Sequence, residues 1–235
     1  TRLSRHASEG DSEAMRADIS QSLRGIGILI VFAMVGLAVI AIPFARFFET
    51  QFDNMQAMAV VIVAYLIGVV PYSGSFVLQR VFYSLENTRT PFFTEVVRSG
   101  LAALGALACA LLPTQFIGVG IALMTSTVAF IHLGLTYWLL RRRFGRLDGT
   151  RVLTRHLQYL AAAVPAGAIG LGLLWMLGGL TDGGFAVASI GGAAASIILI
   201  GTVMAAAYFG LLLLFRNPEL APVVQLLRQR LSRRR

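Results

Sequence analysis

Residues 118–143, GVGIALMTSTVAFIHLGLTYWLLRRR, decide the fold class of this chain. The stretch begins with more than twenty largely apolar residues. A helix of that length can cross the roughly 30 Å hydrocarbon core of a bilayer. Tyr137 and Trp138 lie near the end of this run, and such rings collect at the membrane–water interface. The arginines at 141–143 are typical of the cytoplasmic end of a transmembrane helix. The stretch therefore predicts an integral membrane protein.

Five further apolar runs flank this one, so we expect an all-α integral membrane protein with six transmembrane helices. The predicted crossings are residues 23–47, 58–85, 91–112, 118–140, 153–177 and a segment within 185–215. The second run is longer than one crossing requires at about 1.5 Å per residue. Pro71 and Gly74 predict a kink near its middle, at residues 71–75.

The charged residues give the orientation. All twenty basic side chains are arginines, and nineteen lie in residues 1–24, 80–98, 141–155 and 216–235. The alternate connections carry Glu49, Asp53 and Asp182, with Arg46 as their one cation. Arginine-rich connections stay on the cytoplasmic side of a membrane protein. We therefore expect both ends of the chain to be cytoplasmic, in a multi-pass membrane protein.

Composition excludes an ordinary soluble domain and argues against nucleic acid as a partner. The mean hydropathy is +0.75; 57% of residues are hydrophobic and 13% are charged. The net charge is +9, but the arginines flank apolar runs instead of covering one folded face. Anionic membrane lipids are therefore the expected partners of these arginines. Residues 218–235 repeat leucine and valine at helical spacing among arginines, which predicts a basic amphipathic tail on the cytoplasmic surface.

No pattern of catalytic or metal-binding residues is present, so we expect no enzyme, no cofactor and no metal. His6, His132 and His156 have no partner at metal-ligand spacing. The single cysteine, Cys109, lies in an apolar run, where it is expected to be a small buried hydrophobe. His132 lies inside the fourth crossing, where it is either a proton relay or one end of a helix-to-helix hydrogen bond.

Residues 79–98, between the second and third crossings, contain the candidate site. Arg80 precedes the end of the second crossing, and Glu95 and Arg98 lie one and two turns into the third. One interpretation is a structural clasp, in which Glu95 pairs with Arg98 or Arg80. The other is a water-filled cavity open to the cytoplasm, in which Arg80 and Arg98 bind an anionic substrate and Glu95 orients one of them. Guanidinium groups suit phosphate because they hold it through two parallel hydrogen bonds.

Residues 80–91, RVFYSLENTRTP, resemble the R-x-F-Y-[AS]-L-x-[DN]-T-[RK]-T-P segment of the MviN/MurJ family. The residues of this junction motif, besides Arg80, are Phe82, Tyr83, Asn87, Thr88, Arg89, Thr90 and Pro91. Residues 3–11 are similar to the family's link after its eighth helix, and residues 118–126 to its twelfth helix. The resemblance is good over the first 145 residues and rests on hydropathy afterwards.

This resemblance implies that the chain is a fragment, helices nine to fourteen of a fourteen-helix transporter. The superfamily is that of multidrug, oligosaccharidyl-lipid and polysaccharide exporters. Residues 1–145 would be a cytoplasmic link and four second-lobe crossings. Residues 146–217 would be two C-terminal crossings forming a possible groove for a lipid tail, although their small residues also suit ordinary helix packing. The missing N-terminal lobe of the same protein would be a partner.

The function implied by the resemblance is flipping of lipid II, the undecaprenyl-pyrophosphate-linked peptidoglycan precursor. The lipid would pass by alternating access from the cytoplasmic to the outer leaflet of the bacterial inner (plasma) membrane. Residues 101–112 offer only Cys109 as a polarisable side chain, so no coupling-ion site is carried over. Two alternatives stay open. One is a related exporter of a polysaccharide-lipid or a drug, and the other is a membrane scaffold that transports nothing.

Overall fold

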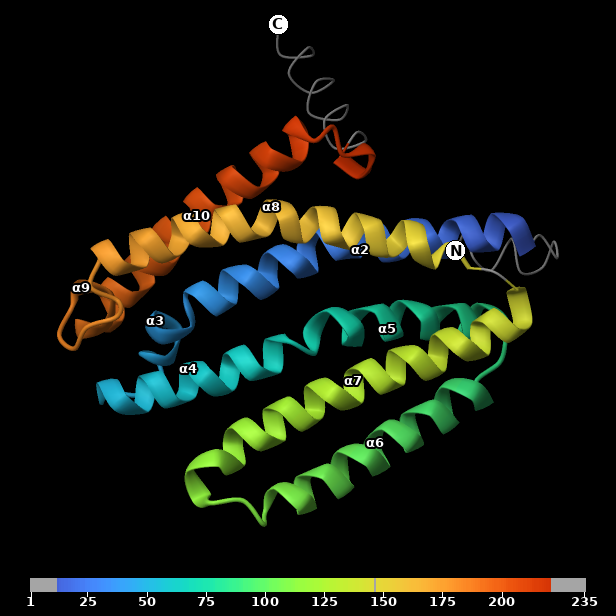
Figure 1. The fold of residues 1–235 in the computed structure, drawn as a ribbon, viewed down its shortest axis with the longest axis horizontal. Helices are drawn as coiled ribbons and strands as arrows, with labels where there is room; N and C mark the ends of the chain where they lie inside the picture. Colours follow the sequence, from blue (N-terminus) through green and yellow to red (C-terminus); the bar gives the residue numbers. More distant parts are fainter. Residues whose placement is uncertain (1–11, 146, 221–235) are drawn as a thin grey trace, which may run out of the picture.

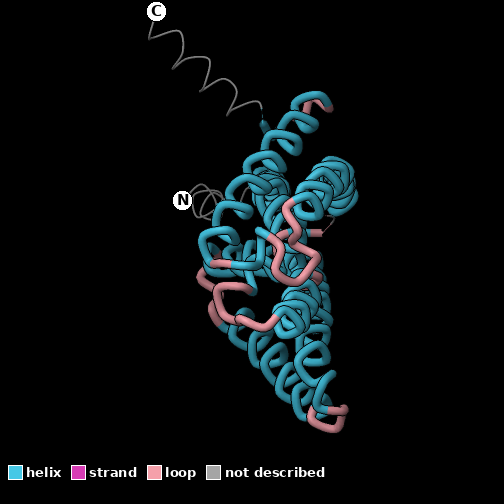
Figure 2. Tube along the Cα trace, turned by 90° about the vertical axis from the view of Figure 1, so that its left-hand side faces the viewer, coloured by secondary structure: helices cyan, strands magenta, loops and turns pink. Residues whose placement is uncertain are grey.

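The computed structural model describes residues 12–145 and 147–220, and these ranges contain helices and connections but no strand (Figures 1 and 2). The helices are α2 (Ser12–Val39), α3 (Ala41–Ala45), α4 (Phe52–Leu66), α5 (Val69–Ser84), α6 (Arg89–Cys109), α7 (Thr114–Phe144), α8 (Gly149–Met176), α9 (Phe185–Ala188) and α10 (Ile190–Leu214), followed by the 3-10 turn η1 (Pro218–Leu220).

The long helices lie side by side in a stack, with α10 and α8 at one end and α6 at the other (Figure 1). Along the stack, α10 packs on α8, α8 on α2, α2 on α5, α5 on α7 and α7 on α6. The first crossing, α2, therefore lies in the middle of the molecule. It separates the two C-terminal crossings from α4–α7.

Six spans in the described part of the chain are long and apolar enough to cross a membrane, which confirms the predicted number. The first helix begins at Ser12, well before the predicted apolar run, because the polar segment ahead of it is helical as well. The sixth begins at Ile190, where the Ser189 hydroxyl oxygen accepts a hydrogen bond from the Gly192 N–H at 3.0 Å. Such a cap satisfies an amide that has no partner within the helix.

The second crossing is interrupted at Ile67–Gly68, a few residues before the predicted position at 71–75. Proline has no N–H, and its ring collides with the carbonyl four residues earlier, which for Pro71 belongs to Ile67. The Gly68 N–H bonds the Tyr65 carbonyl and leaves that of Ala64 free. The Ser126 hydroxyl of α7 donates a 2.7 Å hydrogen bond to this carbonyl. The interruption is thus satisfied by a neighbouring helix, as a membrane interior requires.

Small residues bring α8 against α2 and α10. The α8 positions Ala162, Ala163 and Ala166 are buried in one cluster with Tyr159 of the same helix and Tyr208 of α10. The Tyr208 hydroxyl donates a hydrogen bond to the Ile28 carbonyl of α2 at 2.9 Å. Close backbone approach through alanine and glycine is the usual way that membrane helices associate. In this structure these small faces of α8 are therefore used for helix packing.

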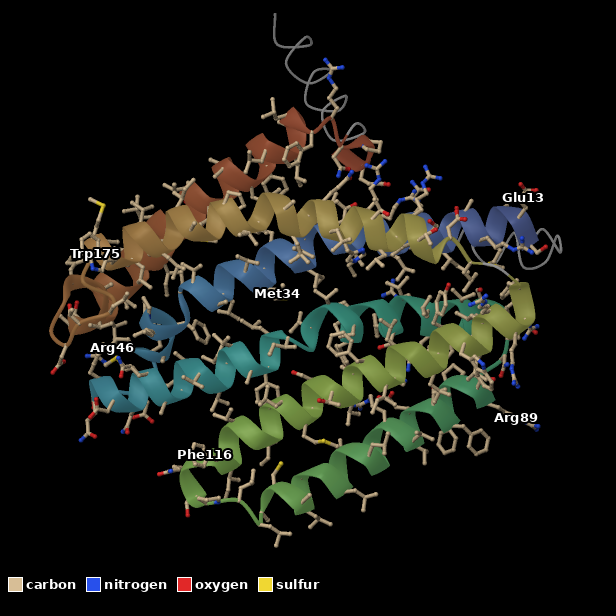
Figure 3. The ribbon with its side chains drawn as sticks, viewed as in Figure 1. Glu13, Met34, Arg46, Arg89, Phe116 and Trp175 are labelled. Carbon is tan, nitrogen blue, oxygen red and sulfur yellow. The ribbon has the colours of Figure 1, made fainter. Side chains whose placement is uncertain are left out.

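The start of α2, the turn between α5 and α6 and the end of α7 lie at one end of the bundle (Figure 1). Glu13 and Arg89 lie at this end, whereas Arg46, Phe116 and Trp175 lie at the other (Figure 3). The Arg142 guanidinium stacks 3.6 Å from the centre of the Trp138 ring, which combines an interfacial aromatic ring with a terminal cation. We call the end at which Glu13, Arg89 and Arg142 lie the basic end.

Candidate functional site: a polar cluster and an apolar cavity

The turn between α5 and α6 is built by the junction motif. Asn87 N–H bonds the Phe82 carbonyl at 3.0 Å, and Glu86 N–H bonds the Tyr83 carbonyl at 3.1 Å, which is the Schellman arrangement that ends a helix. Glu86 takes the left-handed position, with a φ of 56°. Asn87 precedes α6 and supports its first turn, because its side-chain oxygen accepts from the Thr90 N–H at 3.1 Å and its amide donates to the Thr90 hydroxyl at 2.9 Å.

Most of the remaining motif residues either fill the core or face outward. Phe82 and Pro91 are buried, and Phe82 packs with Met15, Ile19 and Leu140 near the basic end. Tyr83, Thr88 and Arg89 are exposed. The motif therefore fixes the hairpin through its buried ring, its proline and its Asn87–Thr90 pair. It leaves one aromatic ring, that of Tyr83, and two guanidinium groups, those of Arg80 and Arg89, on the surface.

Glu95 is the hub of a polar cluster on three helices. One of its oxygens accepts from the Arg98 guanidinium, at 2.8 Å from Nε and 2.7 Å from the terminal nitrogen. The other lies 3.4 Å from the Gln79 amide of α5 and 3.6 Å from Nε2 of His132 on α7. Glu95 therefore pairs with Arg98, one of the two partners expected from the sequence. The pair is only partly buried, since the side chains of Arg98 and Glu95 are 26% and 43% exposed.

Arg80 takes no part in this cluster. It is exposed, and its guanidinium lies 5.0 Å from the centre of the Phe76 ring, one turn earlier on α5. Stacking on an aromatic face holds a guanidinium without using its N–H donors. Arg80 can therefore donate to a bound anion without breaking an ion pair with a described residue. Arg98 can donate to an anion only by giving up its hydrogen bonds to Glu95.

A cavity of about 720 Å³ lies between α2, α5, α7 and α8. The polar side chains on its wall are near the basic end, and they are Arg16, Ser20, Tyr137, Asp148 and His156. Its deeper wall is apolar and includes Val31, Met34, Ile67 and Phe130. Met34 lies near the middle of the bundle (Figure 3). The cavity thus has a polar end and an apolar body, a distribution that would suit an amphiphilic ligand with a polar head and an apolar tail.

The structure does not bring the predicted site residues and this cavity together. Arg80, Glu95 and Arg98 are absent from the cavity wall, and α10 contributes nothing to it. The arginines lie instead on the α5–α6 side of the basic end. Among residues 12–145 and 147–220, no three histidine, cysteine, aspartate or glutamate side chains come together where they could hold a metal ion.

Sequence reasoning treated His132 and Gln79 apart from Glu95, although they are its neighbours. One signal was present. Ionisable residues inside crossings tend to pair with one another, and Glu95 and His132 are two such residues. The participation of Gln79 could not be found in this way, because it depends on how α5, α6 and α7 pack.

The fold defines the class of protein: a multi-pass, all-helical membrane protein with a transporter fold. The sequence profile of the family described as "Lipid II flippase MurJ" matches residues 1–215. The chain belongs to the MurJ family.

A solved structure titled "Lipid II flippase MurJ, inward closed conformation" has a similar fold, with a TM-score of 0.56 and 18% sequence identity. The match covers 90% of this chain and 42% of the solved one. This chain therefore spans less than half the length of that flippase. No curated protein sequence matches it.

Proposed function

We propose that this chain is part of a transporter that flips lipid II, the lipid-linked peptidoglycan precursor, from the cytoplasmic to the outer leaflet of the plasma membrane. The family match over residues 1–215 is the observation that carries the proposal. The transporter would work by alternating access, with the basic end on the cytoplasmic side, and an N-terminal lobe of the same protein would close the translocation path. The arginines of the basic end would also contact anionic lipids.

The geometry supports an anionic headgroup at the α5–α6 side of the basic end. Arg80 is exposed, and its stacking on the Phe76 ring does not use its N–H donors. Arg98 is partly exposed beside Glu95. Two guanidinium groups can hold the oxygens of a pyrophosphate through paired hydrogen bonds. A charged pair left partly exposed inside a span is costly against lipid and is usually found facing water or a substrate path. Arg80 and Arg98 therefore bind the headgroup in this proposal, and Glu95 orients Arg98.

The apolar cavity supports a place for the lipid tail. Its body is lined by Val31, Met34 and Phe130, and its polar end is lined by Arg16 and Ser20. A polyprenyl chain has no polar group to satisfy, so such walls can hold it. The facing small residues of α8 and α10 pack together, so we place the tail between α2, α5, α7 and α8, with only α8 of the last two crossings in contact with it.

The test is complementation of a bacterial strain depleted of its own lipid II flippase. In the full-length gene product, Arg80→Gln combined with Arg98→Gln is expected to abolish growth while membrane insertion is unchanged. Arg98→Lys should keep partial function, because it retains the charge but loses the paired hydrogen bonds. Arg142→Gln is the control, since it removes a cation from the same end, where Arg142 stacks on Trp138.

Normal growth of the double variant would refute the headgroup assignment. Lipid II should accumulate on the cytoplasmic leaflet when the intact protein is depleted from its own host. If another polysaccharide-lipid accumulates instead, the protein is a related exporter. If no lipid-linked intermediate changes leaflet, a scaffold without transport is the better description.

A further inference from the structure

His132 is a buried histidine inside a transmembrane span, with one nitrogen facing a carboxylate. Its side chain is 2% exposed, and its Nε2 lies 3.6 Å from an oxygen of Glu95. The same nitrogen is 3.5 Å from the amide nitrogen of Gln79. Its other nitrogen, Nδ1, is buried and has no hydrogen-bond partner within the described residues. An ionisable side chain in such a place is expensive, and in membrane proteins it generally has a functional role.

We propose that Glu95 and His132 form a proton-binding site, and that an anion bound to Arg98 draws a proton from the cytoplasm onto this site. The inference rests on the proposed function, because it takes Arg98 to be the group that contacts the anionic substrate. It adds the link between that contact and a proton.

Charge balance is the reason for this link. In the structure Glu95 and Arg98 neutralise each other, with two contacts below 3 Å. A phosphate oxygen that takes the Arg98 donors leaves the Glu95 carboxylate without its cation. An unpaired charge inside a bilayer is costly. One proton added to the Glu95–His132 pair restores neutrality. By linkage, the anion then binds more tightly when that proton is present.

The hydrogen-bond geometry shows where the proton goes. In neutral His132 with an unprotonated Nε2, the Gln79 amide donates to that nitrogen, and these two atoms are 3.5 Å apart. A proton placed on Nε2 reverses the polarity of the site, so that His132 donates to the facing oxygen of Glu95. The Gln79 amide keeps Glu95 as an acceptor at 3.4 Å. The hydrogen bond from the Gln79 amide to His132 is lost in exchange, and the 43% exposure of the Glu95 side chain gives the proton a route from water.

The other charged residues of α5 and α6 do not act on His132, since Arg80 is exposed and stacks on Phe76 and Arg89 is exposed at the start of α6. From α6, Glu95 and Arg98 are the charged groups that interact electrostatically with His132. From α5, Gln79 contacts the imidazole, whereas Tyr72 interacts electrostatically with Arg98 and not with His132. On α4, the one charged residue, Asp53, lies at the far end of the helix. Arg98 and Glu95 therefore control the protonation of His132.

The first experiment measures proton uptake by the purified full-length gene product in weakly buffered detergent solution. Undecaprenyl pyrophosphate is the probe, and a pH indicator reports the uptake. We expect roughly one proton taken up per probe bound. His132→Gln should bind the probe with no uptake. Glu95→Gln should also show none and should bind more tightly, because the anion no longer competes with a carboxylate. His6→Gln, which precedes α2, is the matched histidine control and should keep the uptake.

The second experiment needs no ligand. In nitrogen-15 NMR of the histidine-labelled full-length gene product, the imidazole signal that disappears in His132→Gln is that of His132. In Arg98→Gln the Glu95 carboxylate has lost its cation, so His132 should be protonated in a larger fraction of molecules at pH 7 than in the unmodified protein.

The outcomes separate the two proposals. If the probe does not bind, the headgroup assignment fails, and the NMR comparison still decides the proton site. An unchanged His132 spectrum in Arg98→Gln would overturn the inference. Probe binding without uptake in the unmodified protein, or undiminished uptake in His132→Gln, would overturn it as well.

Discussion

At the residue scale, the shortest long-range ion pair among the described residues joins the first crossing to the turn that follows the last one. Arg24 of α2 pairs with Glu219 of η1, and their side chains are only 10% and 13% exposed. Arg24 also donates to the Ser20 hydroxyl at 2.8 Å. A buried ion pair is weak evidence of net stability, but removing one partner leaves an uncompensated charge.

We therefore expect Arg24→Gln to lower the free energy of unfolding by about 3–5 kcal/mol. Adding Glu219→Gln should recover much of that loss, because the stranded carboxylate is then gone. Thermal unfolding in detergent of both single variants and the double variant measures the coupling between the two residues. Losses that simply add would mean that the two side chains do not interact in the folded protein.

Arg46, the lone cation of the opposite end, has a structural role. Its guanidinium donates to the Val187 carbonyl at 2.8 Å and to the Glu49 carbonyl at 3.2 Å, which ties α9 to the end of the first crossing. Hydrogen bonds from a charged donor are worth about 1.5–3 kcal/mol. Arg46→Gln should lower the unfolding temperature, and Arg46→Lys should lower it less. Equal unfolding temperatures for the three proteins would exclude this role.

At the scale of the helix, the interruption of the second crossing shows what sequence patterns can and cannot locate. Pro71 predicted a break in this crossing, and its missing N–H explains why the helix is interrupted a few residues earlier. The position at Ile67–Gly68 depends on α7, because Ser126 satisfies the free Ala64 carbonyl and approaches the backbone of Gly68. That contact joins residues about sixty positions apart, so no local pattern contains it.

Gly68→Ala tests this contact. A Cβ at Gly68 would lie 2.7 Å from the Cα of Ser126, and a backbone atom cannot move aside cheaply. We expect a loss of about 1–3 kcal/mol of stability, the usual cost of overpacking. Gly100→Ala on α6 is the control, because a Cβ there meets nothing within 4 Å. Thermal unfolding of the two variants in detergent should therefore differ, and equal unfolding temperatures would refute the close approach.

At the scale of the whole molecule, the alternation of charged connections predicts which end faces the cytoplasm. Thr150 lies at the basic end and Thr181 at the opposite end, and both are exposed. In a Cys109→Ala background, Thr181→Cys should react with a membrane-impermeant maleimide in intact cells. Thr150→Cys should react only after the membrane is permeabilised. The reverse pattern would overturn the orientation and, with it, the proposed direction of transport.

The number of crossings, their order and the family were predictable because each rests on local signals: run length, terminal arginines and the motif at residues 80–91. The candidate site was predictable in part. Glu95 and Arg98 are three residues apart on one helix, so their pairing follows from helical geometry. The neighbours Gln79 and His132 and the position of the apolar cavity depend on which helices pack together, and spacing along the sequence does not encode that.

The central position of α2 has a consequence for biogenesis. Its Ile28 and Val31 pack against Tyr159 of α8, more than a hundred residues further along the chain. While the ribosome is still delivering the later crossings, that side of α2 has no partner, so lipid or the insertion machinery must shield it. Packing on this side of α2 therefore waits for α8, and nascent chains truncated before residue 149 should be held by the translocon or its chaperones until they are degraded.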